Sequence, residues 1–479
     1  MKKLALSLIP LLMASTAIAE PATDAGVARL TAAFQTYLGG TEGLVTVVAN
    51  GDVYDLTFDA TPLIAKGKDA GVTGSFSSME FTLEDNGDGT WNVSREQPLA
   101  LTVSVPNAMD IKVEVASETF EGVFDENLMT FSSLKDEING MKISETITDP
   151  SGLVTTADIS MDNATLNGTA AAGANGGVDS TLTMTATGLT EALSTPAGKG
   201  QPSVPVTIKA ESLTEDFKGS GLALDGIYKL AAWFTAHPSP EAIEADKAGL
   251  KAALTAAMPF FGNMAGSGKV SKLSVDTPIG VVGLDEVAFT VDMNGAVADG
   301  KFREGISLSG LTLPAGLVPD WAAPILPKKL SLDVQVTDFD AAAGITAAMG
   351  AFDLPAGMAD TTELTQKVQH AFLPKGNVTI TLNPGSVAGD GYELTYEGAM
   401  TAGPEAPVPT GKAKVTLAGA DKLQAALSAA PDDMKAQAMM GFGMAQGMAK
   451  TEGDKLVWEI DASTPGAVSV NGTPLMGGN

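Results

Sequence analysis

Short runs of alternating apolar and polar residues recur through most of the chain. They follow one another between residues 44 and 187, separated by turn sequences such as Asn50-Gly51, and they resume after residue 269. Alternation with a period of two gives a strand one apolar and one polar face, and Asn-Gly tolerates the positive φ values of a tight hairpin turn. The pattern therefore predicts antiparallel, meandering strands with one face turned to water.

The segment 306–382 contains an internal repeat. Each copy reads Leu-Pro-Ala-Gly, a connector, Leu-Pro-Lys and then an alternating strand. The copies begin at Leu313 and Leu354. Just before the first copy the apolar positions change phase at Gly310, which predicts a bulge that bends the sheet. The repeat describes an architecture and assigns no activity.

Helix-like spacing of apolar residues is confined to a few segments between the strands. These segments are residues 24–38, 224–236, 239–261, 360–372 and 421–450. The sequence therefore predicts an α+β fold, predominantly antiparallel β, in which long curved sheets of meandering strands carry a few packed helices.

The chain divides into three regions. Residues 1–19 combine Lys2-Lys3, a short apolar run and Ala17-Ile18-Ala19, which are the features of a cleavable signal peptide. A segment rich in Ala, Gly, Pro and Ser then separates an N-terminal antiparallel β domain, residues 20–200, from a C-terminal α+β domain, residues 201–479. The signal peptide predicts a periplasmic protein, with an extracellular location as the alternative. The sequence leaves open whether the two domains share one sheet.

Composition excludes some partners. The chain has no cysteine, so it forms no disulfide, and no apolar run after residue 19 is long enough to cross a membrane as a helix. We expect a soluble mature protein without a transmembrane segment. There are 57 acidic and 29 basic residues, and two of the basic ones, Lys2 and Lys3, belong to the signal peptide, so the mature chain carries a net charge of −30. Such a surface repels phosphate backbones, which argues against nucleic-acid binding.

Side chains suited to catalysis are scarce. The two histidines, His237 and His370, are far apart and are interpreted as surface or helix-capping residues. Neither Gly-x-Ser-x-Gly nor His-Glu-x-x-His occurs. Residues 85–89 resemble a calcium loop, but flanking strands and the lack of an acid at its last position favour a hairpin turn. We therefore predict a non-enzymatic protein without catalytic residues, metal or cofactor. A hydrolase that uses carboxylates alone is the enzymatic alternative.

Methionines near the C-terminus form the candidate ligand-binding site. Met440, Met444 and Met448 lie at i, i+4 and i+8 on one helical face, with Phe442 nearby. Because methionine fills irregular gaps, packing in a core is one interpretation. The other is an adaptable apolar surface for a lipid or a protein partner. Interleaved glycines favour the second, because they weaken a helix unless something approaches it closely.

Several features together resemble a known family. They are the signal peptide, Asp85-Asn86-Gly87-Asp88-Gly89-Thr90 leading into a strand, the late Met/Gly/Ala-rich helix, and the final Trp458-Glu459-Ile460 and Val470-Asn471-Gly472. The chain resembles an uncharacterised family of secreted bacterial proteins catalogued as domain of unknown function 2125. More distantly, it resembles AsmA-like envelope proteins, whose elongated curved sheets are thought to handle lipids. This chain differs from the second group in lacking a membrane anchor, and neither resemblance implies catalytic residues.

Two function hypotheses follow. The first is a binding or carrier protein whose curved sheet holds an apolar ligand such as lipid. The second is a structural or assembly factor of the cell envelope that acts through contacts with envelope proteins, by an edge strand or by the methionine face.

Overall fold

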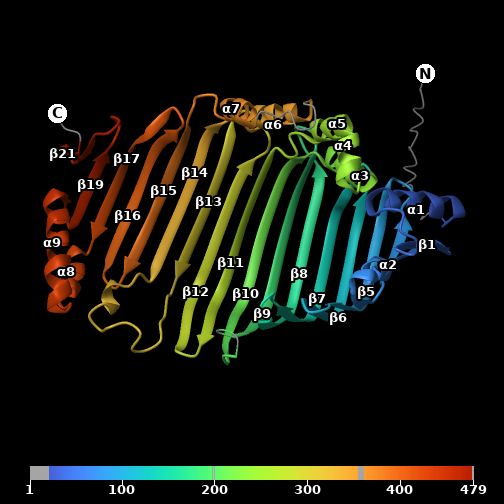
Figure 1. Cartoon of the computed structure of the whole chain (residues 1–479), viewed down its shortest axis with the longest axis horizontal. Helices are drawn as coiled ribbons and strands as arrows, with labels where there is room; N and C mark the ends of the chain where they lie inside the picture. Colours follow the sequence, from blue (N-terminus) through green and yellow to red (C-terminus); the bar gives the residue numbers. More distant parts are fainter. Residues whose placement is uncertain (1–20, 197, 199, 354–360, 477–479) are drawn as a thin grey trace, which may run out of the picture.

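The computed structural model of the chain describes residues 21–196, 198, 200–353 and 361–476 (Figure 1). The predicted signal peptide and the start of the second repeat copy, Leu354, lie outside these residues. The described strands join into one long, open, antiparallel sheet, and the helices lie along its rim and at its two ends (Figure 1). This confirms the predicted α+β fold with predominantly antiparallel strands in a curved sheet.

The strands lengthen toward the middle of the chain and shorten again at its end. They are β1 (Val45–Asn50), β2 (Val53–Phe58), β3 (Thr73–Phe76), β4 (Met79–Asp85), β5 (Thr90–Val105), β6 (Met109–Asp125), β7 (Thr130–Thr148), β8 (Val154–Ala172), β9 (Val178–Pro196), β10 (Ser203–Leu222), β11 (Asn263–Thr277), β12 (Gly280–Asn294), β13 (Gly300–Ser309), β14 (Lys329–Phe339), β15 (Val378–Gly389), β16 (Tyr392–Gly403), β17 (Ala406–Ala418), β18 (Lys450–Glu452), β19 (Lys455–Asp461), β20 (Val468–Val470) and β21 (Thr473–Met476).

The helices occur mainly in the segments that the sequence predicts. They are α1 (Asp24–Leu38), α2 (Thr61–Lys66), α3 (Leu224–Ala236), α4 (Pro240–Ala245), α5 (Lys247–Ala257), α6 (Ala341–Met349), α7 (Thr361–Phe372), α8 (Ala420–Ser428) and α9 (Asp432–Met448), with single 3-10 turns at Lys68–Ala70, Ala323–Ile325 and Gly350–Asp353. The segment 239–261 forms two helices because Asp246 leaves helical geometry and its side chain caps α5 at the Gly249 N–H. Segment 421–450 is likewise divided, before Asp432.

The sheet order follows the chain. Each strand from β4 to β17 pairs antiparallel with the next, while β1 and β2 precede β4 at one edge and β19, β20 and β21 follow β17 at the other. Across residue 200, β9 and β10 pair from Pro196 and Ser203 onward. The two parts of the chain therefore share one sheet. Residue 200 lies in the turn of this hairpin, and the division into two domains there stays a prediction.

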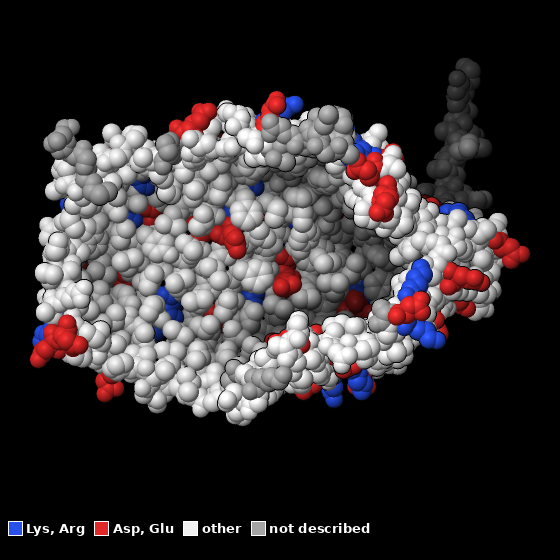
Figure 2. Space-filling view, in the orientation of Figure 1, with Lys and Arg blue, Asp and Glu red and all other residues white. Residues whose placement is uncertain are grey.

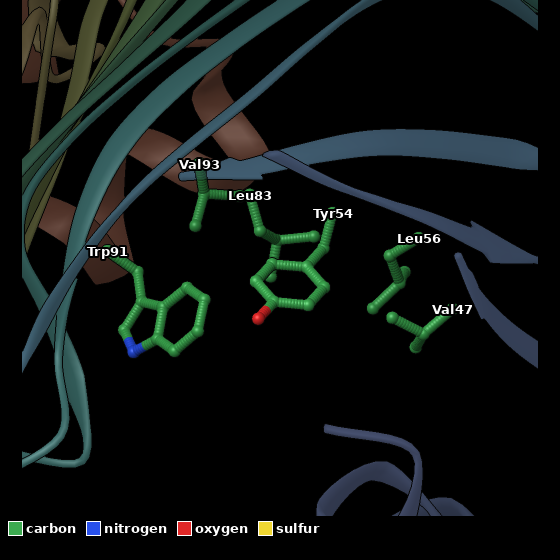
Figure 3. Close-up of a cluster of buried hydrophobic side chains, with 6 residues drawn as sticks. All are labelled: Val47, Tyr54, Leu56, Leu83, Trp91 and Val93. Carbon is green, nitrogen blue, oxygen red and sulfur yellow. The ribbon is translucent and has the colours of Figure 1, made fainter. Parts of the chain in front are cut away.

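One face of the sheet is mainly apolar along its length, and we call it the inner face. At the N-terminal end it carries a buried cluster that includes Val47, Tyr54, Leu83 and Trp91, with α1 packed against it. The strands curve around these side chains (Figure 3). Because directly paired residues on neighbouring strands point to the same side, the pairing register assigns the other strand residues to this face or to the opposite, outer face.

Along each strand from β6 to β13, the alternation of side chains between the inner and the outer face shifts by one residue at a single position. These positions lie side by side in a row across the sheet, which we call the crease. Its members, one in each strand from β6 to β12 and one directly after β13, are Ala116, Gly140, Asp162, Gly188, Glu211, Lys272, Asp285 and Gly310. Every second one has a positive φ, between 52° and 69°. On each side of the row the pairing register is the same. The phase change expected at Gly310 is therefore present, but the predicted bulge is wrong, because no residue is inserted between β12 and β13.

The crease keeps apolar residues on the inner face although their spacing in the sequence changes. Ile138 and Met141 on β7 are three residues apart, yet both contact the buried cluster formed by Met161, Ala164 and Ala186. A strict alternation would place Ile138 and Met141 on opposite faces. Gly140 lies between them with a positive φ, and this conformation brings the side chain of Met141 back to the inner face.

Replacing Gly188 by alanine is expected to destabilise the protein by about 1–3 kcal/mol. Gly188 has φ +65°, and an added Cβ would overlap the Asp162 carboxylate. Gly152 is the matched control, because it has φ +84° and open space around a Cβ, so Gly152→Ala adds backbone strain alone. Urea unfolding should give a larger loss for Gly188→Ala than for Gly152→Ala. Equal losses would contradict close packing in the crease.

Candidate functional site: the hollow inner face

The inner face forms a long hollow. In the space-filling view this face is hollowed along the molecule, and most of its lining is neither acidic nor basic (Figure 2). The accessible surface of the chain is 27443 Å², whereas a compact monomer of this mass exposes about 17,000 Å². Counting the residues outside the described set as unfolded chain accounts for only about 5000 Å² of the excess. Much of the sheet is therefore uncovered.

An uncovered apolar surface, which we call the apolar wall, spans β12 to β16 in the middle of the inner face. Cross-strand pairing places its members side by side. They are Val287, Phe289, Val291, Met293, Phe302, Ile306, Leu308, Leu330, Leu332, Val334, Val336, Ile380, Leu382, Val387, Leu394 and Met400. Phe289 pairs with Ile306, and Ile306 with Leu332, so these three form a continuous row across the strands.

Five large side chains of the apolar wall are exposed to solvent. Phe289, Phe302, Ile306, Leu332 and Met400 are 38–43% exposed. Single exposed apolar residues are common on protein surfaces, but a contiguous patch of them marks a contact site. The apolar wall thus has the shape and chemistry to hold an elongated apolar molecule.

Helices close both ends of the inner face. At the N-terminal end, Val27, Leu30 and Phe34 of α1 pack on the buried cluster. At the other end, α9 lies against β19, where the Trp458 Nε1–H donates a hydrogen bond of 2.8 Å to the Ala445 carbonyl. The uncovered part is consequently the middle of the sheet, bounded by α1 and α9.

A buried charge cluster lies on the inner face near its N-terminal end. Arg95 forms an ion pair with Glu118, and the side chains of both are at most 6% exposed. The guanidinium carbon lies 4.5 Å from the centre of the Phe81 ring. Burial lowers the pKa of Arg95, and it raises the pKa of Asp136, which faces the same guanidinium. One oxygen each of Glu118 and Asp136 has no hydrogen-bond partner.

The methionines that the sequence singles out lie on α9 and differ in exposure. Met440 and Met444 are 64% and 65% exposed, whereas Met448 and Phe442 are half-buried. Open space surrounds the positions that a Cβ would occupy at Gly441, Gly443 and Gly447, so no neighbour among the described residues requires these glycines. Binding of a ligand at Met440, Met444, Met448 and Phe442 stays a prediction.

The other motifs have structural roles in the part of the chain that is described. His237 is the C-terminal cap of α3 and stacks on Trp233, with ring centres 4.1 Å apart, and His370 is exposed on α7. Residues 85–89 form a hairpin turn in which the Asp85 and Asp88 carboxylates accept backbone N–H groups. Within the described ranges, no three His, Asp or Glu side chains are grouped to hold a metal ion.

Two further observations limit the site. Two surface grooves, of about 690 and 640 Å³, are lined mainly by polar residues of the outer face, such as Thr82, Glu121, Lys414 and Asp461. The residues that line these two grooves do not form a recognisable catalytic or metal-binding group. Among the helices of the described residues, none has both the length and the apolar character needed to cross a bilayer.

Comparisons of the chain with protein-family models, curated proteins and solved structures found no match. The resemblances to the uncharacterised secreted family and to AsmA-like proteins therefore stay expectations from the sequence. Fold and site define the chain as an open, curved antiparallel sheet with an uncovered apolar inner face.

The sequence reasoning placed the candidate site on α9 and missed the apolar wall. A signal for it exists in the alternating apolar positions of β12, β13, β14 and β15, which the sequence assigned to half-buried strands. The helical segments around them are too short to cover so many strands. Comparing the apolar strand area with the helix area available to cover it would have indicated an exposed face.

Proposed function

We propose that the chain is a non-enzymatic binding or carrier protein for an apolar ligand such as lipid, acting in the periplasm. One observation carries the proposal: the row formed by Phe289, Ile306 and Leu332 remains exposed on a concave face. In water such a surface is unfavourable by about 25 cal/mol for each Å² of apolar area. An apolar ligand removes that cost, and the curvature lets the wall contact the ligand from several strands.

The double variant Phe289→Ser/Ile306→Ser is expected to weaken binding of the neutral apolar dye diphenylhexatriene by about 100-fold, because each side chain contributes roughly 1.5 kcal/mol or more of apolar contact. The matched control is Val48→Ser/Val281→Ser. Both valines are exposed as well, at 54% and 51% against 40% for Phe289 and 43% for Ile306, but they lie on the outer face. Fluorescence titration of the purified protein measures the affinities.

Native mass spectrometry with organic extraction provides the complementary test, using protein purified from a bacterial periplasm without detergent. A stoichiometric apolar adduct, lost in Phe289→Ser/Ile306→Ser and kept in the control, supports the carrier function. A mass without any adduct, together with no dye binding, would contradict the carrier function. The assembly-factor hypothesis would then take its place. It is favoured by edge strand β1, which among the described strands pairs with β2 alone and contains no proline or charged residue to block further pairing.

A further inference from the structure

Charged residues are sorted between the two faces of the sheet. The lysines of β6, β7, β10 and β11 that lie off the crease point to the outer face, as do the basic residues of β13, β14, β17, β18 and β19. Many of them pair with acids there, for example Lys269 with Glu286 and Arg303 with Asp333. Among the described strand residues that lie off the crease, Arg95 is the one basic side chain of the inner face, and Glu118 already pairs with it.

Four carboxylates on the inner face have no such partner. Glu145, Glu191, Glu215 and Glu304 have neither an ion pair nor a side-chain hydrogen bond with any described residue. Acidic atoms are visible in the middle of the hollow (Figure 2). The inner face therefore offers negative charge without the positive charge that compensates it on the outer face.

Each of these carboxylates lies within an apolar row. Glu145 pairs with Ile111 and Ala157, and Glu191 with Ile159 and Ile208. Glu215 pairs with Met184 and Gly268.

Glu304 lies inside the apolar wall itself. Its partners across the strands are Val291 and Val334, and Phe302 and Ile306 flank it on β13. Glu215 lies at the border of the wall, because Gly268 pairs with Phe289 on β12. An apolar molecule lying along Phe289 and Ile306 would thus bring its polar end near one of these two carboxylates.

A negative charge among apolar side chains discriminates between ligands of opposite charge. Ligand binding displaces water from around the carboxylate, which strengthens its interaction with a nearby ion. An anionic head group would be repelled, while an ammonium group would gain the partner that the protein does not supply.

We propose that the ligand of the apolar wall is a cationic amphiphile, with an apolar chain along Phe289, Ile306 and Leu332 and an amine head at Glu304 or Glu215. This inference rests on the proposed carrier function and names the charge of its ligand. The apolar wall fits the chain of such a ligand, and the carboxylates in and beside the wall fit its positive charge.

Three probes with the same chain length test the inference: dodecylamine, dodecanol and dodecanoate, each below its micellar concentration, as competitors of diphenylhexatriene. Dodecylamine is expected to bind at least about tenfold more tightly than dodecanoate, with dodecanol between them. The preference should shrink as salt is added, because the charges become screened.

Variant Glu215→Gln/Glu304→Gln is expected to abolish most of the preference, whereas uncharged dodecanol should bind no more weakly than before, because dehydrating an amide costs less than dehydrating a carboxylate. The control Glu286→Gln/Glu397→Gln changes the net charge of the chain equally, but on the outer face, and should keep the preference. Equal affinity for dodecylamine and dodecanoate, or an undiminished preference in Glu215→Gln/Glu304→Gln, overturns the inference and leaves the carrier function intact. No binding of any of the three probes overturns both.

Discussion

Arg95→Met is expected to lower the free energy of unfolding by about 3–5 kcal/mol. The substitution leaves the Glu118 carboxylate, which is 6% exposed, without its cation. An unpaired buried charge is far more costly than the loss of the pair as a whole. Methionine matches the length of the arginine stem, so packing against the Phe81 ring is largely kept.

The double variant Arg95→Met/Glu118→Met separates the two effects. It removes both charges and fills the space with apolar atoms, so it should recover most of the stability that Arg95→Met loses. The part not recovered is assigned to Asp136, whose carboxyl also faces Arg95. Urea unfolding of the three proteins measures the difference. A double variant as unstable as Arg95→Met would contradict a desolvated ion pair at this place.

Trp91→Ala is expected to cost about 3–5 kcal/mol and to loosen the N-terminal end of the sheet in particular. Trp91 is 3% exposed. Its ring centre lies 5.8 Å from that of Tyr54, and its Nε1–H donates a hydrogen bond of 2.7 Å to Glu126. The alanine would leave a cavity between α1 and the strands that no neighbour fills without moving.

In so long an open sheet, each strand packs mainly on its sequence neighbours, so damage at one end need not unfold the other. Amide hydrogen exchange should therefore rise in α1, β2, β4 and β5 of Trp91→Ala and stay unchanged from β14 to β19. Trp458→Ala is the matched control at the other end. Trp458 is only half-buried, so a smaller loss is expected there, confined to α9 and β19. A uniform rise over the whole sheet in either variant would contradict this local coupling.

Local pattern was sufficient for most of the secondary structure. The observed bounds of α1 and α3, Asp24–Leu38 and Leu224–Ala236, equal the predicted ones, because apolar spacing and helix-ending residues act within a few positions of one another. The hairpin expected at Asn50-Gly51 is present: Asn50 pairs with Val53 as the last residue of β1, and Gly51 supplies the positive φ, +65°, that the tight turn needs. Gly310 likewise marked a real change of phase.

The bulge predicted at Gly310 was wrong because a bulge is defined by the pairing with a neighbouring strand, which the sequence does not show. The sequence of one strand shows that the apolar positions shift by one residue. Only the pairing register with β12 shows that no residue is inserted there. Gly140, Gly188 and Lys272 belong to the same row but are 48 or more positions apart in sequence. Their alignment is a property of the sheet and cannot be read from any one strand.

The surroundings of the methionine stripe of α9 could not be predicted from the sequence for a related reason. Periodicity places Met440, Met444 and Met448 on one helical face, but it does not tell whether that face meets the sheet or the solvent. The position of α9 against β19 decides this, and it leaves Met440 and Met444 exposed and Phe442 half-buried.

By itself, the sequence determined the strand and helix content, the antiparallel meander, the absence of cysteine chemistry and the strongly acidic charge, because these depend on residue type and short-range spacing. Only the tertiary structure decided that one sheet spans both parts of the chain, that the apolar positions of β12 to β16 stay uncovered, and that unpaired carboxylates lie among them. The physical reason is that burial and charge pairing depend on which distant segments lie over a surface, and alternation along a strand gives its two faces without telling what covers either one.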